Sequence, residues 1–226
     1  MTFKTEVNHG TRFEFGKNWS QFLKLLNEER INIAEQSLRR FLEIDTLEDK
    51  TFLDIGSGSG LYSLAARRLG AKVHSFDYDL QSVSCTSELK RRYFPDDHNW
   101  NVESGDALDK NYLKNLGKFD VVYSWGVLHH TGDMWNALNN ASELVKENGF
   151  FYVSIYNDQG GPSRRILKIK KIYNILPNGL KWVIWIPMLI KLWWRNILRD
   201  LIQDGKLFST WRNYAQVEAR GMSAFT

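Results

Sequence analysis

The stretch Thr51-Phe52-Leu53-Asp54-Ile55-Gly56-Ser57-Gly58-Ser59-Gly60 decides the fold of this chain. Its first half is a short, mainly apolar run, which predicts a buried strand. Three glycines follow at alternate positions, and residues 61–69 then predict a helix that ends at Gly70. Because glycine has no side chain, the backbone of such a turn can approach a ligand closely. The stretch therefore predicts a ligand-binding turn at the carboxyl end of a buried strand.

The same alternation of strand and helix continues along the chain. Further strands are expected at residues 72–76, 100–104, 119–124 and 150–156, and helices at residues 19–42, 80–94 and 134–146, with a turn at 147–149. Strands that alternate with helices indicate an α/β fold with a doubly wound, mostly parallel sheet and helices on both faces. Ligands of such sheets bind outside the carboxyl ends of the strands, where the strand order reverses.

The glycine spacing distinguishes two kinds of nucleotide-binding turn. A dinucleotide fingerprint, Gly-x-Gly-x-x-Gly, would need a glycine at Leu61, whereas here the third glycine comes one residue earlier, at Gly60. With Asp54 ahead of the glycines, the run from Leu53 to Gly60 resembles the first motif of class I S-adenosylmethionine-dependent methyltransferases. The resemblance extends over residues 51–156. It implies a Rossmann-like domain with S-adenosylmethionine as cofactor and S-adenosylhomocysteine as product.

The resemblance also implies which residues contact the cofactor. The turn would hold its amino-acid end, with the ammonium near Asp54, and an acid after the second strand would accept the ribose hydroxyls. Asp77 is the first choice for that acid, and Asp79 is either the second choice or the N-cap of the next helix. Asp106 would contact the adenine, although a lone aspartate there is also typical of an ordinary turn. The full expected set is Asp54, Gly56, Ser57, Gly58, Gly60, Asp77, Tyr78, Asp106, Ala107, Ser124 and Trp125.

The segment after the expected fourth strand resembles the part of the family that faces the methyl group. Ser124 and Trp125 would line that end of the cofactor. His129 and His130 are candidate catalytic bases, because a histidine titrates near neutral pH. The alternative is that both histidines are structural. No carboxylate pair at ligand spacing accompanies them, and we expect no metal site.

The N-terminal part of the chain combines aromatic residues with charge. Residues 12–19 are too aromatic for a free tail, so Phe15 and Trp19 are expected either to cover the cofactor as a lid or to pack against the core. The first residues are polar where a secretory signal would be apolar, and Cys85 is the single cysteine. Both features favour a reducing compartment, and we expect a cytoplasmic protein.

The last third of the chain is basic and rich in tryptophan. Residues 159–199 contain nine lysines and arginines and no acidic residue. Residues 163–176 predict a basic amphipathic helix, and the apolar run 182–190 is too short to span a bilayer. This extension could cap the substrate, touch a membrane or anionic lipid through residues 162–199, or form an interface in a homo-oligomer. No clear strand pair is visible in residues 200–226.

Three segments follow from these patterns: an N-terminal lid segment and helix (1–50), a cofactor-binding core (51–158) and the basic extension (159–226). The expected function is methylation of a small molecule, at an oxygen of an anionic, sugar or lipid-like acceptor. An RNA methyltransferase and a non-catalytic cofactor-binding scaffold are the alternatives. Nucleic acid is disfavoured because the chain has no separate RNA-binding module and no Asn-Pro-Pro-Tyr-like motif after the fourth strand.

Overall fold

The computed structural model describes residues 16–157, 160–190 and 194. The chain divides into two compact units, Met1–Tyr156 and Asn157–Thr226. The first unit contains α2 (Gly16–Phe22), α3 (Glu28–Leu42), β1 (Thr51–Ile55), α4 (Leu61–Arg68), β2 (Lys72–Asp77), α5 (Leu80–Tyr93), β3 (Trp100–Ser104), α6 (Lys110–Leu116), β4 (Phe119–Trp125), the 3-10 turn η1 (Leu128–His130), α7 (Met134–Ser142) and β5 (Val145–Ser154). The second contains α8 (Gly161–Ile175) and η2 (Asn178–Leu180).

The first unit is built on a parallel sheet with the strand order β3-β2-β1-β4-β5. Every neighbouring pair in this sheet is parallel. The chain moves outward from β1 through β2 to β3 and then returns to the other side of β1 as β4. The order therefore reverses between β1 and β4, which confirms the predicted doubly wound sheet.

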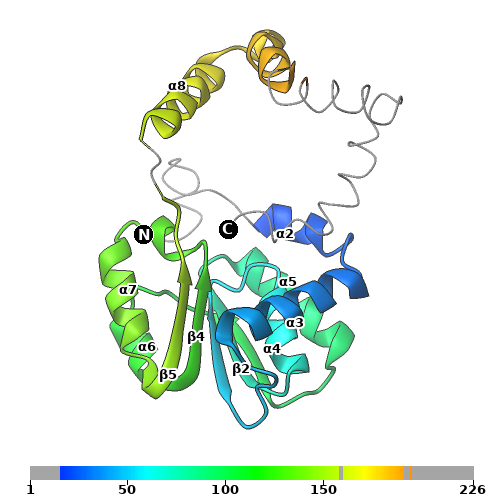
Figure 1. The fold of residues 1–226 in the computed structure, drawn as a ribbon, viewed down its shortest axis with the longest axis vertical. Coiled ribbons are helices and arrows are strands. Elements are labelled where there is room, and N and C mark those ends of the chain that lie inside the picture. The colour runs from blue at the N-terminus through cyan, green and yellow to red at the C-terminus, as the bar shows by residue number, and fades with distance from the viewer. Residues whose placement is uncertain (1–15, 158–159, 191–193, 195–226) are drawn as a thin grey trace. The chain divides into compact units, whose positions relative to one another are not determined.

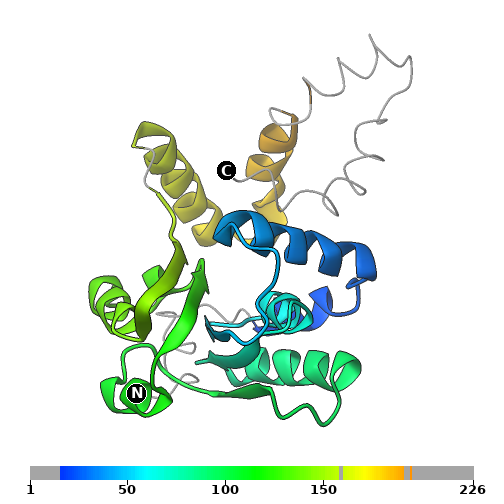
Figure 2. The same ribbon diagram turned by 60° about the horizontal axis from the view of Figure 1, so that its bottom comes forward.

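Helices cover both faces of this sheet, and each face has its own apolar core (Figures 1 and 2). Neighbouring side chains of β1 point to opposite faces, as the pleat requires. Phe52 belongs to the cluster that α3, α4 and α5 cover. Leu53 belongs to the cluster that α6 and α7 cover. Both side chains are fully buried, so the sheet is the centre of a three-layer domain.

The predicted helix over residues 19–42 is wrong in one respect, because the structure divides it into α2 and α3. The Asn27 side chain accepts a hydrogen bond from the Arg30 N–H at 3.0 Å and caps the start of α3. An asparagine at this position offers the backbone a better partner than continuing the helix. The apolar spacing persists across the break, which is why periodicity alone did not reveal it.

Two further predictions of local structure fail around β5. The predicted helix over residues 134–146 ends at Ser142, and the predicted turn over residues 147–149 lies inside β5. The register between β4 and β5 is irregular there, and Asn148 has a left-handed φ of 62°. The strand thus absorbs the turn-like residues as an irregularity. The sequence also did not predict α6, whose N-cap is Asp109.

In the second unit, α8 confirms the helix predicted from residue 163 to residue 176, within two residues at its start. The apolar run 182–190 is also helical. No helix in the described ranges combines the length and apolar character needed to cross a membrane. Phe15 and residues 200–226 lie outside the described residues.

Candidate functional site

The carboxyl ends of the strands gather the predicted site residues at one edge of the sheet. Ile55 lies beside Phe76 in the register, and Asp77 lies beside Ser104. The arrowheads of β4 and β5 mark this edge in Figure 1. The segments that follow the strands therefore lie along it, and they include residues 56–60, 78–79, 105–107 and 126–130.

The glycine turn is bonded directly to the end of β2. The Gly58 N–H donates to Asp77 Oδ2 at 2.9 Å. The N–H groups of Gly56 and Ser57 both donate to the Phe76 carbonyl, at 2.9 and 3.1 Å. The sequence predicts that this turn holds the amino-acid end of the cofactor, whereas in the structure these N–H groups are bonded within the chain. The turn is therefore held in place before any ligand arrives.

Neighbouring atoms approach the turn so closely that none of its three glycines has room for a Cβ, and at Gly60 the nearest atom is the Thr86 Cα. Gly56 has φ of 77°, and a Cβ there would overlap the Val127 side chain. Gly58 has φ of 56°, and a Cβ there would lie 2.9 Å from Trp19 Nε1. The Trp19 indole thus lies against the turn, in the place that either a lid or a packing role would require.

Asp77, the last residue of β2, and Asp79, two residues later, have different surroundings. Asp77 Oδ1 accepts from the Asp79 N–H at 2.9 Å, while its Oδ2 accepts from Gly58. Burial raises the pKa of Asp77 to about 6, against the opposing effect of these N–H donors. Asp79 instead caps α5 by accepting from the Gln81 N–H at 2.9 Å. Tyr78 lies between them and is half-buried. Capping therefore occupies Asp79 and leaves Asp77 as the acid on the turn.

Asp54 lies at the end of a buried chain of hydrogen bonds. Ser63 of α4 donates to Asp54 Oδ2, Ser75 of β2 donates to Ser63 at 2.8 Å, and Trp100 Nε1 of β3 donates to Ser75 at 3.0 Å. Burial raises the pKa of Asp54 to about 7, the bond from Ser63 lowers it, and the charge of Asp77 raises it. The buried Asp54 and the half-buried Asp77 thus place two carboxyl groups beside the turn.

The predicted adenine segment is fixed by α7. Asp106 Oδ1 accepts from the Leu108 N–H at 2.9 Å, so this carboxylate closes a local turn. Ala107 is buried, and its carbonyl accepts from Asn140 Nδ2 at 3.0 Å. The turn role that sequence reasoning left open for Asp106 is therefore present. Its contact with adenine stays a prediction.

Ser124 and Trp125 face different surroundings at the end of β4. The fully buried Ser124 hydroxyl donates to the Ile55 carbonyl at 3.0 Å and ties β4 to β1. Trp125 stacks on Tyr152 and Phe41, with ring centroids 5.9 and 5.8 Å apart. Trp125 therefore belongs to an aromatic wall on the α3 side of the sheet.

The two histidines form a compact aromatic group with Tyr156. The His129 ring centroid lies 4.0 Å from that of His130 and 4.4 Å from that of Tyr156. Both ring nitrogens of His129 are shielded from solvent and have no hydrogen-bond partner within the described residues. Burial and the charge of His130 lower the pKa of His129. A neutral imidazole with unused nitrogens results, one of which can accept a proton.

Three residues of the site were not predicted from the sequence. Ser63 and Ser75 support Asp54, and Thr86 Oγ1 lies 2.9 Å from the Ser57 hydroxyl. These small polar residues sit on α4, β2 and α5, and each is unremarkable in its own segment. Only the fold brings them together, so no local pattern could have identified them.

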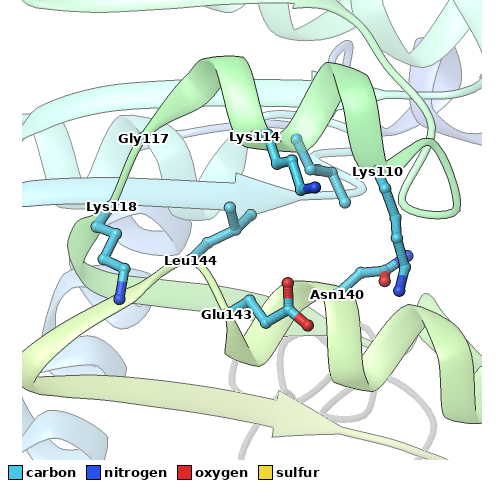
Figure 3. Close-up of a pocket in the computed structure, with 8 residues that line it drawn as sticks. Lys110, Lys114, Gly117, Lys118, Asn140, Glu143 and Leu144 are labelled. Atoms are coloured by element: carbon cyan, nitrogen blue, oxygen red, sulfur yellow. The ribbon is translucent and has the colours of Figure 1, made fainter.

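A hollow between α6 and α7 lies apart from these residues (Figure 3). Lys110 and Lys114 of α6 lie across it from Glu143, the residue that follows α7. None of its lining residues belongs to the predicted site. Among the residues that the structure describes, no three histidine, cysteine, aspartate or glutamate side chains come together as metal ligands.

The sequence and the fold are each similar to those of known proteins. A family model described as a methyltransferase domain matches residues 26–215. A ubiquinone biosynthesis O-methyltransferase of Coxiella burnetii is 28% identical over 158 residues, covering 70% of this chain and 62% of its own length. A protein of the same name from Pelagibacter ubique is 26% identical over 168 residues, covering 72% and 63%. This chain thus spans somewhat under two thirds of these relatives.

Among solved structures, magnesium protoporphyrin IX methyltransferase from Synechocystis PCC 6803 with bound SAH superposes with a TM-score of 0.50. The two share 20% sequence identity, and the match covers 68% of this chain and 69% of the other. This likeness confirms the predicted fold. Because the family model covers most of the sequence, the chain belongs to the methyltransferase domain family.

Proposed function

We propose that this chain transfers the methyl group of S-adenosylmethionine to an oxygen atom of a small-molecule acceptor. The observation that carries the proposal is the hydrogen bond from the Gly58 N–H to Asp77 Oδ2. It joins the glycine turn after β1 to the acid after β2, the two parts expected to hold the amino-acid end and the ribose of one nucleoside.

The charges beside the turn fit this cofactor. Asp54 is buried and Asp77 is half-buried, and each has a raised pKa because desolvation disfavours its charged form. A ligand that brings an ammonium and a sulfonium would relieve this cost. Asp77 accepts from the N–H groups of Gly58 and Asp79, and the Tyr78 N–H also lowers its pKa. A carboxylate offers about four acceptor positions, so Asp77 can still accept a ribose hydroxyl.

Methyl transfer also requires a place for the acceptor and a group that takes up its proton. The residues after β4 are proposed to supply both. When bound, the cofactor supplies an activated methyl group with a neutral thioether as leaving group. The protein's contribution is then to align the acceptor, exclude water and remove a proton from a hydroxyl. His129 is suited to the last task, since its low pKa keeps it neutral and its nitrogens are unused among the described residues.

Oxygen is the proposed acceptor atom because the two relatives compared above are both named ubiquinone biosynthesis O-methyltransferases. A hydroxylated quinone precursor is accordingly the first acceptor to test, followed by lipid-linked sugars and acidic metabolites. The basic extension is compatible with all three, because each carries an anionic or lipid-like portion.

The cofactor site is tested by calorimetry with S-adenosylhomocysteine. Asp77→Asn removes the charge that is proposed to accept the ribose hydroxyls, and we expect about tenfold to hundredfold weaker binding. Asp79→Asn is the matched control: asparagine caps helices as well as aspartate, so its affinity should equal that of the wild type. Unchanged affinity in Asp77→Asn would remove the site assignment.

Transfer itself is tested with radiolabelled S-adenosylmethionine and a fractionated cell extract. The proposal expects label in a small-molecule fraction, in an alkali-stable ether or an alkali-labile ester linkage to oxygen. Label in RNA would instead support the RNA methyltransferase alternative. Binding of S-adenosylhomocysteine without labelled product in any fraction would support a non-catalytic scaffold.

A further inference from the structure

The second unit exposes far more apolar surface than a soluble helix needs. No residue of α8 is buried, and its Ile166, Leu167 and Ile172 are each about half exposed. The helix at residues 182–190 follows it and consists entirely of apolar residues. Its Trp182, Val183, Trp185, Leu189 and Ile190 are between 43% and 61% exposed. Many exposed apolar side chains on two successive helices indicate an interaction site.

The length of this surface restricts what it can contact. Nine helical residues extend about 14 Å, less than half of the roughly 30 Å hydrocarbon core of a bilayer. The described residues 182–190 are therefore too short to span that core by themselves. Apolar helices of this length with tryptophans and flanking lysines can instead lie in the plane of the membrane interface.

The charge of the same unit selects the partner. Arg164, Lys168 and Lys171 follow one side of α8 at spacings of four and three residues, while Ile166, Ile169 and Tyr173 follow another side. Residues 159–199 contain no acidic residue. A second copy of this chain would bring the same positive charge, which disfavours self-association through this surface. Nucleic acid would leave the exposed valine, isoleucine and leucine side chains without an apolar partner.

We propose that residues 161–190 bind the surface of an anionic lipid bilayer. The apolar helix at 182–190 inserts at the boundary between headgroups and acyl chains, and the lysines and arginines of α8 contact the headgroups. This interaction does not depend on methyl transfer, so it can be measured without cofactor.

The charge requirement is tested by flotation of the full chain with phosphatidylcholine vesicles that do or do not contain phosphatidylglycerol. The wild type should float with the anionic vesicles only, and added salt should release it. Arg164→Glu with Lys168→Glu should weaken partitioning at least about tenfold. Lys110→Glu with Lys114→Glu is the matched control, because these residues are also exposed and four apart on a helix of the first unit. This control pair should retain binding.

The apolar requirement is tested with Trp182→Ser and Trp185→Ser in one chain, which should also abolish flotation. Trp135→Ser is the control, because Trp135 is 74% exposed on α7 of the first unit. Circular dichroism and the affinity for S-adenosylhomocysteine report whether each variant has folded and whether the proposed cofactor site is intact. A folded wild type that ignores anionic vesicles overturns the lipid proposal. Equal loss of flotation in the control variants also overturns it. So does a wild type that binds no vesicles but forms a dimer that the tryptophan substitutions dissociate. Tighter binding of single-stranded RNA than of vesicles overturns it as well.

Discussion

Asp54 shows how a single carboxylate can be supported from a distance. The Trp100 indole can only donate, so Ser75 must accept from it and turn its own hydrogen toward Ser63. Ser63 must then donate to Asp54. The chain of hydrogen bonds therefore has one direction, and it ends by stabilising the charged form of Asp54 against burial. Ser63 thus favours the charged form of Asp54 directly, while Ser75 and Trp100 support Ser63 from two other elements.

This arrangement makes cofactor binding depend on pH. The pKa of Asp54 is about 7, so the free protein takes up a proton there as the pH falls below 7. The ammonium of the ligand's amino-acid end needs the charged form of Asp54, and its binding must release that proton. We expect the affinity for S-adenosylhomocysteine to fall below pH 7, by up to about tenfold per pH unit. Calorimetry in buffers of different ionisation enthalpy measures the released proton.

Ser63→Ala removes the bond that favours the charged form, so the fall in affinity should begin at a higher pH than in the wild type. Ser75→Ala leaves the bond from Ser63 to Asp54 in place but strands the Trp100 N–H. It should lower the melting temperature and leave the pH profile unchanged. An identical profile for wild type and Ser63→Ala would contradict the role assigned to this chain of hydrogen bonds.

A substitution of His129 distinguishes a role as catalytic base from a role in packing. If it takes the proton of the acceptor, His129→Asn should lower kcat by about 10²- to 10⁴-fold without changing the affinity for S-adenosylhomocysteine. The adjacent exposed His130→Asn should have a much smaller effect. Equal activity of His129→Asn and wild type, measured with the acceptor found in the extract screen, would assign His129 to packing.

At the scale of elements, the parts of the fold that a local pattern defines were predictable. The strand-turn-helix unit at residues 51–69 needs only an apolar run, glycines and a helix, and the structure has all three. The limits of β5 were not predictable, because pairing with β4 holds Asn148 in a strand although asparagine and glycine together favour a turn. The break before α3 depends on a single capping side chain, Asn27.

In the candidate site, too, some residues could be predicted from the local sequence and others depend on contacts between elements. Asp54 and Asp77 could be chosen in advance because each immediately borders a predicted strand end or turn. The contacts that change the proton affinity of these two acids could not be chosen in advance, because Ser63 approaches Asp54 and the Gly58 N–H approaches Asp77 from other elements. The close approach of Trp19 to Gly58 likewise depends on how α2 packs, which no pattern in residues 16–22 reveals.

That approach makes the glycine turn sensitive to one added methyl group. In Gly58→Ala the new Cβ would meet Trp19 and the left-handed φ would be strained, so we expect at least about tenfold weaker binding of S-adenosylhomocysteine. Gly132→Ala is the control, because Gly132 also has a positive φ but has open space around it. Adding Trp19→Ala to Gly58→Ala should restore part of the affinity. No recovery in the double variant would show that backbone strain alone is responsible.

At the scale of the whole molecule, burial is distributed unevenly between the two units. The members of both apolar clusters come from residues 19–153. Every described residue that is buried precedes residue 145. The family match nevertheless runs from residue 26 to residue 215 and so includes residues of both units. The similarity to the methyltransferase family therefore extends into the second unit, although the first unit supplies all of the described buried core.

This distribution predicts that a chain ending at Tyr156 keeps its fold and its cofactor site. It retains both apolar clusters, the glycine turn, Asp54, Asp77 and the chain of hydrogen bonds from Trp100, so its affinity for S-adenosylhomocysteine should stay within about threefold of the full chain (within ~0.7 kcal/mol). The shortened chain should also lose flotation with anionic vesicles, because residues 161–190 are gone. Calorimetry, circular dichroism and flotation on one preparation measure all three properties. A shortened chain that unfolds or loses the ligand would mean that the second unit stabilises the first, and retained flotation would place the lipid contact on the first unit.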